Sequence, residues 1–265
     1  MATALTIAGS DSGGGAGLQA DLKTFAAYGI YGTSALTAVT AQNTSGVVAI
    51  APMSADFVTS QIEAVAGDIP IDVTKIGMLA TIAIVEAVAA AIEDLDLPLV
   101  VVDPVMVSST GERLLESDAV QALRRELFPL ARVVTPNIPE AEALSGRHIR
   151  SDTDARDAAR RIQDMGPRAV IITGGHARIP NPDSRITDLL LDGDEWSEFD
   201  GERIASPPLH GTGCTYASAV AAGLALGRSL SDAARDAQQF VVGAIRHAKP
   251  VGRGRIPLQH LWRLY

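Results

Sequence analysis

Four short runs in this 265-residue chain consist mostly of apolar, β-favouring residues, and they constrain the fold more than any other feature. A strand that is apolar on both faces is buried on both faces, as the central strands of a parallel sheet are. The runs are Leu5–Ala8, Leu99–Val102, Arg132–Val134 and Ala169–Ile172. They predict a parallel sheet at the centre of the molecule.

Segments with helical periodicity separate these runs, and several begin at a Ser or Asp that can cap a helix. Such alternation is typical of an α/β fold, in which helices cover both faces of a mostly parallel sheet. The helical segments are 17–28, 55–66, 82–93, 117–127 and 152–165. The length is that of a single domain, which we expect to cover residues 1–265.

The pattern changes after Gly174. Residues Ile186–Leu191 and Trp196–Ala205 predict two antiparallel strands, joined by a turn at Asp192–Asp194. Two alanine-rich helices are expected to follow them.

Composition argues against several classes of function. A formal net charge of -9 argues against a nucleic-acid partner, because phosphate binding needs clustered Lys and Arg. The sequence has no basic leader and no run of about 18 uninterrupted apolar residues, so we expect a cytoplasmic protein without a membrane span. We also expect a homodimer. A single cysteine, Cys214, excludes an intrachain disulfide.

Ligands of an open α/β sheet bind beyond the carboxyl ends of its strands, so functional residues are expected in the loops there. The loop Gly9–Gly17 either brings bare backbone against a ligand or is a flexible turn. Within it, Gly15–Ala20 resembles the dinucleotide fingerprint, but no Asp or Glu between Asp21 and Asp56 is available to hold a ribose. None of the three lysines completes a Walker-type phosphate loop.

A stronger indication of an anion site is the segment His210–Thr215, which opens a long apolar helix. The backbone N–H groups of Gly211, Thr212 and Gly213 are free at a helix start, where they stabilise charge on a transferring phosphoryl group. Cys214 lies in the first turn, where the helix dipole lowers a thiol pKa and favours a proton acceptor. The alternative for Cys214 is a small buried apolar residue.

Carboxylates and an amide follow two of the apolar runs. Asp103 ends one run, and Asn137 and Glu140 come shortly after another. Two carboxylates and an amide on neighbouring strand ends suit a magnesium ion that keeps several waters. The alternatives are a first-turn helix role for Glu140 and a loop cap before Pro104 for Asp103.

Three further positions have the chemistry of ligand contacts. Thr173, with Gly174 and Gly175 after it, offers a hydroxyl and open space to a nucleotide. Gln42 carries an amide that donates and accepts together, which suits the edge of a heteroaromatic ring. Asp21 either anchors a hydroxyl or amine of a small substrate, or faces solvent on its helix.

Six motifs in order resemble those of the hydroxymethylpyrimidine/phosphomethylpyrimidine kinases of thiamine biosynthesis. They are Leu5–Asp21, Thr40–Thr44, Lys75–Leu79, Asp103–Met106, Thr135–Glu140 and His210–Cys214. The resemblance covers nearly the whole chain. It implies a ribokinase-like fold, and the ATP- and Mg²⁺-dependent phosphorylation of 4-amino-5-hydroxymethyl-2-methylpyrimidine and then of its monophosphate.

The same resemblance implies roles for individual residues. Cys214 would be the catalytic base, Gly211–Gly213 the anion hole, and Asp103 and Glu140 the metal ligands. The residues that would contact the pyrimidine are Gly9, Asp21, Gln42 and Met78. The nucleotide contacts expected from the loops are Asn137, Thr173 and Gly175.

Two alternatives remain open at this point. One is a pyridoxal kinase of the same superfamily, because pyridoxal is also a flat heteroaromatic alcohol. The other is a non-catalytic binding regulator, against which the intact set of motif residues speaks. The chain departs from the family pattern in its tail, where Arg253 and Arg255 stand in a segment expected to be glycine-rich and uncharged.

Overall fold

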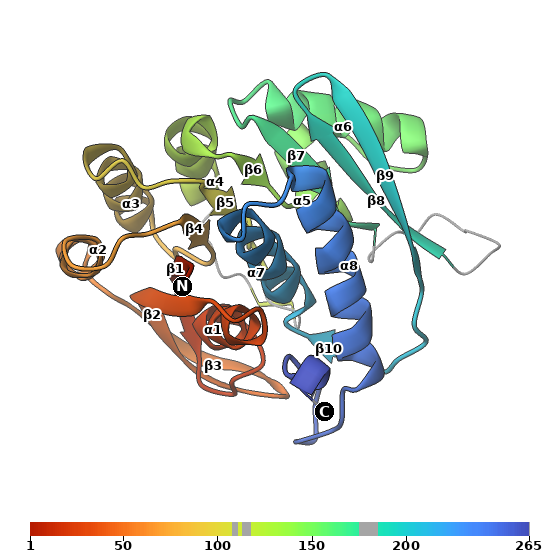
Figure 1. The fold of residues 1–265 in the computed structure, drawn as a ribbon, viewed down its shortest axis with the longest axis horizontal. Coiled ribbons are helices and arrows are strands. Elements are labelled where there is room, and N and C mark those ends of the chain that lie inside the picture. Colours follow the sequence, from red (N-terminus) through yellow and green to blue (C-terminus); the bar gives the residue numbers. More distant parts are fainter. Residues whose placement is uncertain (108–110, 113–117, 175–184, 265) are drawn as a thin grey trace.

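The computed structural model describes residues 1–107, 111–112, 118–174 and 185–264, and these residues form one large sheet and one short strand pair (Figure 1). The strand order in the large sheet is β3-β2-β1-β4-β5-β6-β7-β8-β9. Its strands are β1 Thr3–Asp11, β2 Tyr31–Asn43, β3 Gly46–Pro52, β4 Val73–Ile76, β5 Val101–Val102, β6 Val133–Val134, β7 Ala169–Ile172, β8 Arg185–Asp192 and β9 Glu195–Glu202. The short pair joins β10 Leu209–His210 to β11 Ile256–Pro257.

The six central strands, β2, β1, β4, β5, β6 and β7, pair in parallel. Strand β3 is antiparallel at one edge, and β8 and β9 are antiparallel at the other. Because parallel strands need crossover connections, helical segments that pack on a face of the sheet link these strands. The mostly parallel sheet that the sequence predicted is therefore confirmed.

Helices cover both faces of the sheet, and each face has its own hydrophobic core. One core is completed by α2 Ala55–Ala66, α3 Ile82–Asp94, α4 Ala119–Ala122, α5 Ile138–Ser145 and α6 Asp152–Gln163. The other is completed by α1 Gly17–Ala27, α7 Thr212–Ala225 and α8 Leu230–Arg246. No helix in the described ranges is both long and apolar enough to span a membrane.

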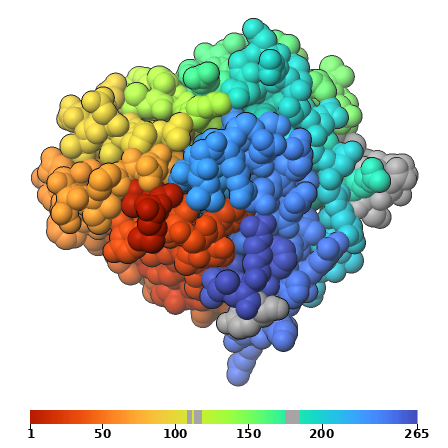
Figure 2. Space-filling model, in the orientation of Figure 1, coloured from red at the N-terminus to blue at the C-terminus, as the bar shows by residue number. Residues whose placement is uncertain are grey.

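The two C-terminal helices pack against elements from both halves of the chain. In the space-filling view, their blue surface fills the middle of one face, between the red N-terminal part and the cyan outer strands (Figure 2). Helix α7 packs against α1 and against β4 and β5, and α8 packs against α7 and β9. The start of α7 is therefore held by elements from both halves of the sequence.

Several predicted elements differ from those observed. The run Leu99–Val102 pairs only over Val101–Val102, because Leu99 adopts a positive φ of 46° and is 38% exposed. In the segment predicted as one helix over 117–127, α4 covers only Ala119–Ala122 and a π-helical turn, Leu123–Leu127, follows; Ser117 lies outside the described residues. The predicted antiparallel pair is confirmed, with β9 ending at Glu202.

The outer edge of the sheet contains a buried carboxylate, Asp188 of β8. Its side chain accepts hydrogen bonds from the backbone N–H of Gly174 at 2.8 Å and from Nε2 of Gln238 at 2.9 Å. Burial raises the pKa of Asp188 to about 6, and these hydrogen bonds lower it only in part. Asp188 thereby connects α8 to the loop after β7.

We predict that the Asp188→Asn variant loses a pH dependence of stability that the wild type has. The folded pKa of about 6 lies above the ordinary 3.8, so the folded state holds an extra proton between these values. Its contribution to stability is therefore lost as pH rises through 6, by about 1 kcal/mol between pH 5 and 7. Urea unfolding of both proteins at several pH values measures the difference, and parallel curves would contradict the prediction.

Candidate active site

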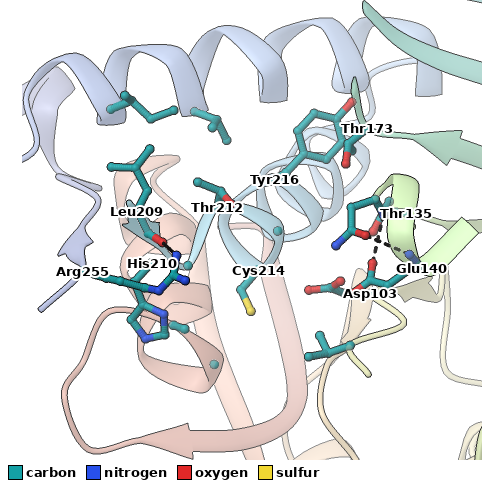
Figure 3. A pocket seen from close by; sticks show the side chains of 18 of the residues that line it. Asp103, Thr135, Glu140, Thr173, Leu209, His210, Thr212, Cys214, Tyr216 and Arg255 are labelled. Carbon is teal, nitrogen blue, oxygen red and sulfur yellow. Dashed lines mark hydrogen bonds between the residues drawn. The ribbon is translucent and has the colours of Figure 1, made fainter. Parts of the chain in front are cut away.

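A cavity of about 990 Å³ lies at the carboxyl ends of the parallel strands and at the start of α7 (Figure 3). The ends of β1, β2, β4, β5, β6 and β7 each contribute to its wall. Predicted site residues that line it are Gly9, Gln42, Met78, Asp103, Asn137, Glu140, Thr173, Gly211, Thr212, Gly213 and Cys214. Two predicted residues do not belong to this set: Asp21 lies beneath the cavity, and Gly175 lies outside the described residues.

The N-terminus of α7 opens directly into the cavity. Gly211 is its N-cap, with a left-handed φ of 88° and no side-chain hydrogen bond to the helix start. A Cβ atom on Gly211 would lie 1.9 Å from the carbonyl oxygen of Gly15, so the close approach of the two glycine loops requires glycine here. The first N–H groups of α7 are left to a ligand in the cavity, and their shared direction favours an anion.

Cys214 points into the same part of the cavity (Figure 3), but its thiol does not have the predicted lowered pKa. Burial raises the pKa of Cys214 well above its ordinary value, and the positive charge of Lys75 does not outweigh that effect. The helix dipole corresponds to about half a charge, whereas desolvation acts on the whole thiolate. The expectation of a thiolate near neutral pH in the free protein is therefore wrong.

A fully buried ion pair lies beneath the cavity. Lys75 of β4 has its Nζ 3.0 Å from both carboxylate oxygens of Asp21 on α1. Asp21 also accepts hydrogen bonds from Thr6 at 2.6 Å and from Ser218 of α7 at 2.7 Å. Burial opposes the positive charge of Lys75, but its acidic neighbours hold the lysine pKa above the ordinary value. Lys75 is therefore a permanent cation.

These contacts change the interpretation of Asp21. The sequence suggested either a direct substrate anchor or a solvent-facing helix residue, but Asp21 is completely buried. Its two carboxylate oxygens are bonded to Thr6 of β1, Lys75 of β4 and Ser218 of α7. Asp21 thus acts on the cavity through Lys75 and through the position of α7.

Asp103 and Glu140 are the two carboxylates of the cavity. Burial raises the pKa of Asp103 to about 6, against the lowering effect of Lys75, whose Nζ lies 3.9 Å from Oδ2. Burial, and then repulsion by Asp103, raises the pKa of Glu140 to about 8. Both shifts mean that the two negative charges lack sufficient compensation in this site.

This pair fits a magnesium ion. Asp103 Oδ2 is buried and has no hydrogen-bond partner among the described residues, so one oxygen is available as a ligand. No group of three or more His, Cys, Asp or Glu in the described ranges is arranged to hold a metal by itself. Mg²⁺ commonly takes only one or two protein carboxylates and fills its remaining positions with phosphate and water.

Asn137 and Glu140 also form the capping box of α5. The Asn137 side chain accepts from the Glu140 backbone N–H at 3.0 Å, and the Glu140 carboxylate accepts from the Asn137 N–H at 2.9 Å. The structural role suggested for Glu140 is therefore confirmed, and it coexists with a place on the cavity wall. Thr173 forms an isolated β-bridge with Asn137, which places its hydroxyl on the same wall.

Gly9 and Met78 form the opposite, apolar wall. A Cβ atom on Gly9 would lie 2.3 Å from Cε of Met78, so the methionine occupies the space that a side chain at residue 9 would need. Met78 packs with Ala38 and Ala80 in a small cluster of buried residues. This wall has the flat, apolar surface that suits a ring.

Gln42 lies beside that wall at the end of β2. Its amide contacts the hydroxyl of Thr40 at 3.1 Å and Nε2 of His210 at 3.1 Å. His210 in turn lies 2.8 Å from the carboxylate of Asp11. The sequence identified Gln42 but gave no role to Asp11, His210 or Lys75. The available signals were weak: Lys75 lies within a short apolar run, and Asp11 and His210 lie within glycine-rich motifs.

The C-terminal tail reaches this side of the cavity through Arg255. Its Nη1 lies 3.4 Å from the carbonyl oxygen of Leu209, and its side chain lines the cavity above His210 (Figure 3). Arg253 is exposed and does not line the cavity. Of the two tail arginines, only Arg255 is positioned to influence a ligand.

Comparison with known proteins identifies one family over almost the whole chain. The family model "Phosphomethylpyrimidine kinase" matches residues 11–259. The chain is 47% identical over 259 residues to the hydroxymethylpyrimidine/phosphomethylpyrimidine kinase of Haemophilus influenzae, covering 97% of this chain and 95% of that protein. It is 49% identical to the thiamine biosynthesis bifunctional protein of Geobacter sulfurreducens, of whose length it spans 52%.

Among solved structures, an ADP complex of Bacillus subtilis pyridoxal kinase superposes with a TM-score of 0.90. The two chains are 38% identical, and the match covers 100% of each. The fold is therefore shared by kinases with two different named substrates, and the fold alone does not distinguish between them.

We predict that the Lys75→Met variant is destabilised by about 3–5 kcal/mol, because it leaves the Asp21 carboxylate buried without its cation. The double variant Asp21→Asn/Lys75→Met should recover at least about 1 kcal/mol, since no uncompensated charge remains. Urea unfolding at pH 7 measures both values. A double variant less stable than Lys75→Met alone would contradict the assignment of the pair.

Proposed function

We propose, because this chain belongs to the phosphomethylpyrimidine kinase family, that it transfers the γ-phosphoryl group of ATP to 4-amino-5-hydroxymethyl-2-methylpyrimidine. We further propose that it phosphorylates the resulting monophosphate to the diphosphate, for thiamine biosynthesis. The observation that carries the proposal is the geometry of one cavity, in which the start of α7 faces Asp103 and Glu140. Phosphoryl transfer requires this combination, since the transferred group and its counterion bind side by side.

Each part of the site has a defined task in this reaction. The N–H groups at the start of α7 are fixed in direction, so they stabilise charge on the transferring group without reorganising. Asp103 and Glu140 would hold Mg²⁺, which when bound neutralises phosphate charge. Thr173 and Asn137 line the end of the cavity that we assign to the nucleotide. Gly175, outside the described residues, stays a predicted nucleotide contact.

The pyrimidine is assigned to the wall formed by Gly9, Met78 and Gln42. The apolar surface of Gly9 and Met78 accepts the face of the ring, and the Gln42 amide supplies donor and acceptor atoms for its edge. Asp21 supports this region through Lys75. The hydroxymethyl group would then be directed toward Cys214 and the start of α7.

Cys214 remains our candidate for the catalytic base, but its raised pKa adds one requirement. A thiol that holds its proton cannot take a second one, so that proton must leave first. Besides burial, the negative charge of Asp103 is one of the causes that raise the pKa of Cys214, and Lys75 lowers it. With Mg²⁺ held by Asp103, that negative charge would be compensated, so that the thiol could release its proton to water in the cavity. The thiolate sulfur then takes the proton of the substrate hydroxyl as the oxygen–phosphorus bond forms.

A pyridoxal kinase is the second candidate, favoured by the structural match to the Bacillus subtilis enzyme. Pyridoxal is an aromatic alcohol of similar size, so the cavity volume does not exclude it. The pyrimidine is preferred because the hydroxymethylpyrimidine/phosphomethylpyrimidine kinases of Haemophilus influenzae and Bacillus subtilis are 47% and 44% identical, against 38% for that pyridoxal kinase. A binding regulator without chemistry would not need an open helix start facing two carboxylates.

Cytoplasmic location, a homodimer, the absence of nucleic-acid and membrane partners, and a single domain over residues 1–265 stay predictions. The formal net charge of -9 supports the absence of a nucleic-acid partner, and the single large sheet supports a single domain.

We predict that the purified protein phosphorylates the pyrimidine alcohol with a higher kcat/KM than pyridoxal, because the ratio of these constants reports differential transition-state binding. A coupled ADP assay with the alcohol, its monophosphate and pyridoxal measures all three substrates. The same assay with EDTA in place of Mg²⁺ should show loss of activity. A preference for pyridoxal would overturn the substrate assignment and leave the kinase assignment intact.

We predict that Cys214→Ala lowers kcat by about 10²–10⁴-fold while binding of the pyrimidine alcohol is largely kept, as expected for loss of a base. Steady-state kinetics give kcat, and calorimetric titration without ATP gives the dissociation constant. Turnover at the wild-type rate would return Cys214 to the role of a small buried residue.

A further inference from the structure

Three polar side chains from distant parts of the sequence meet at one side of the cavity. Asp11 ends β1, Gln42 lies near the end of β2, and His210 immediately precedes the Gly211 cap of α7. Asp11 and His210 are only 3% and 9% exposed. Since water has little access to them, their hydrogen bonds have fixed partners.

Asp11 determines the state of His210. Its carboxylate accepts hydrogen bonds from the backbone N–H groups of Gly13, Gly15 and Ala16 at 2.8–2.9 Å. Burial raises the pKa of Asp11, but the hydrogen bonds from His210 and this backbone outweigh it and lower the pKa below its ordinary value. Asp11 is therefore an ionised acceptor, and Nε2 of His210, 2.8 Å away, carries the hydrogen of that contact.

His210 in turn determines which end of the Gln42 amide faces it. The same Nε2 lies 3.1 Å from the Gln42 amide. The structure places the amide nitrogen toward Nε2. Nε2 carries a hydrogen, and two N–H donors cannot hydrogen-bond to each other. Amide nitrogen and oxygen have nearly the same shape, so we turn the amide by 180°, which brings its oxygen to Nε2. The Nε2–H group is then shared between the Asp11 carboxylate and the Gln42 carbonyl.

Thr40 independently requires the same orientation. Its hydroxyl donates its single hydrogen to the carbonyl oxygen of Ser10 at 2.8 Å, an atom that can only accept. The Gln42 atom placed 3.1 Å from that hydroxyl is the amide oxygen, for which the hydroxyl has no hydrogen left. A donor is needed there, and the same 180° turn brings the amide nitrogen to this position. The arguments from both ends of the amide agree.

We propose that His210, fixed by Asp11, is a positioning residue that holds the Gln42 amide in one orientation and thereby sets which substrate edge the cavity accepts. This inference rests on the proposed function, and it adds a specificity determinant to that site. An amide has two N–H donors and two acceptor lone pairs, and the contacts with Thr40 and His210 use one of each. One donor and one acceptor remain for a ligand, in an order that cannot be reversed while the amide is held.

The position of the His210 ring is itself constrained. A Cβ atom on Gly15 would lie 2.7 Å from Cδ2 of the ring, so glycine at that position lets the loop close directly onto the histidine. Leu209 and His210 pair with Ile256 and Pro257 of the tail, which fixes the backbone on the other side. The ring therefore has support that does not depend on a bound substrate.

The test is a double-mutant cycle between His210 and Gln42, with KM and kcat measured for the pyrimidine alcohol and for pyridoxal. His210→Phe keeps the ring and removes the donor, and His210→Gln restores an N–H near the Nε2 position. We expect His210→Phe to raise KM for the pyrimidine alcohol about 3–10-fold, with a smaller change in kcat and in KM for ATP. His210→Gln should recover most of this loss.

The cycle distinguishes an effect through Gln42 from a general one. If His210 acts through Gln42, adding His210→Phe to Gln42→Ala should change KM by less than about twofold further. In His210→Phe, the ratio of kcat/KM for the pyrimidine alcohol to kcat/KM for pyridoxal should fall by a factor similar to the rise in KM. If the KM effects of His210→Phe and Gln42→Ala multiply in the double variant, or if His210→Phe raises only KM for ATP, the proposal is overturned in favour of a role at the start of α7. His148→Phe, at a histidine with an 83% exposed side chain, is the matched control.

A measurement without turnover keeps the proposal falsifiable if His210→Phe does not fold. Long-range ¹H–¹⁵N spectra of the wild type, with the His210 signals assigned from His210→Gln, should show a hydrogen on Nε2, and a bare Nε2 would overturn the proposal. Asp11→Asn, which keeps the ring, should raise KM for the pyrimidine alcohol without adding to Gln42→Ala. If the wild type prefers pyridoxal, the proposed function fails, and the same cycle is run with pyridoxal.

Discussion

The buried ion pair between Lys75 and Asp21 connects the elements on which the rest of the site depends. Asp21 lies on α1 and is bonded to Thr6 of β1 and Ser218 of α7, while Lys75 lies on β4 and approaches Asp103 after β5. A buried charge that loses its partner costs several kcal/mol, so these elements have only one favourable relative placement. The same side chains, Lys75 and Asp21, therefore fix the position of the anion-binding start of α7 relative to the carboxylate of Asp103.

The distribution of charge in the cavity follows from that arrangement. One fully buried lysine compensates Asp21 well and Asp103 only partly, and Glu140 adds a further negative charge. Uncompensated carboxylates destabilise a free protein, but they become favourable when a divalent cation and a polyphosphate bind together. The open start of α7 supplies the complementary partial positive charge for the phosphate oxygens. The free site is therefore less stable electrostatically than the substrate-bound site would be.

Local patterns in the sequence were sufficient to predict the parallel sheet, the two layers of helices and the antiparallel edge formed by β8 and β9. They failed where a contact over long sequence distance changed the meaning of a residue. Strand β4 was not predicted because it contains Lys75. A lysine in a short apolar run argues against a buried strand unless its partner is known, and that partner, Asp21, lies 54 residues away. Asp21 was expected at a surface or on a substrate, for the same reason. The predicted direction of the Cys214 pKa shift was wrong. A sequence shows that a residue lies at a helix start, but it does not show how far the residue is removed from water.

The sequence predicted the phosphate-binding part of the candidate site. It did not predict the contacts that orient the Gln42 amide. Glycines at a helix start and acidic residues after strands are local signals, and the structure brings them into one cavity. The contacts among Asp11, Gln42 and His210 join residues up to 199 positions apart, and no local pattern identifies them. His210 and Gly211 are nevertheless consecutive in the chain, so one backbone segment carries both the group that orients Gln42 and the cap of the anion-binding helix. A displacement of that segment would change ring recognition and phosphate binding together, and the two halves of the reaction are therefore mechanically coupled at this point of the fold.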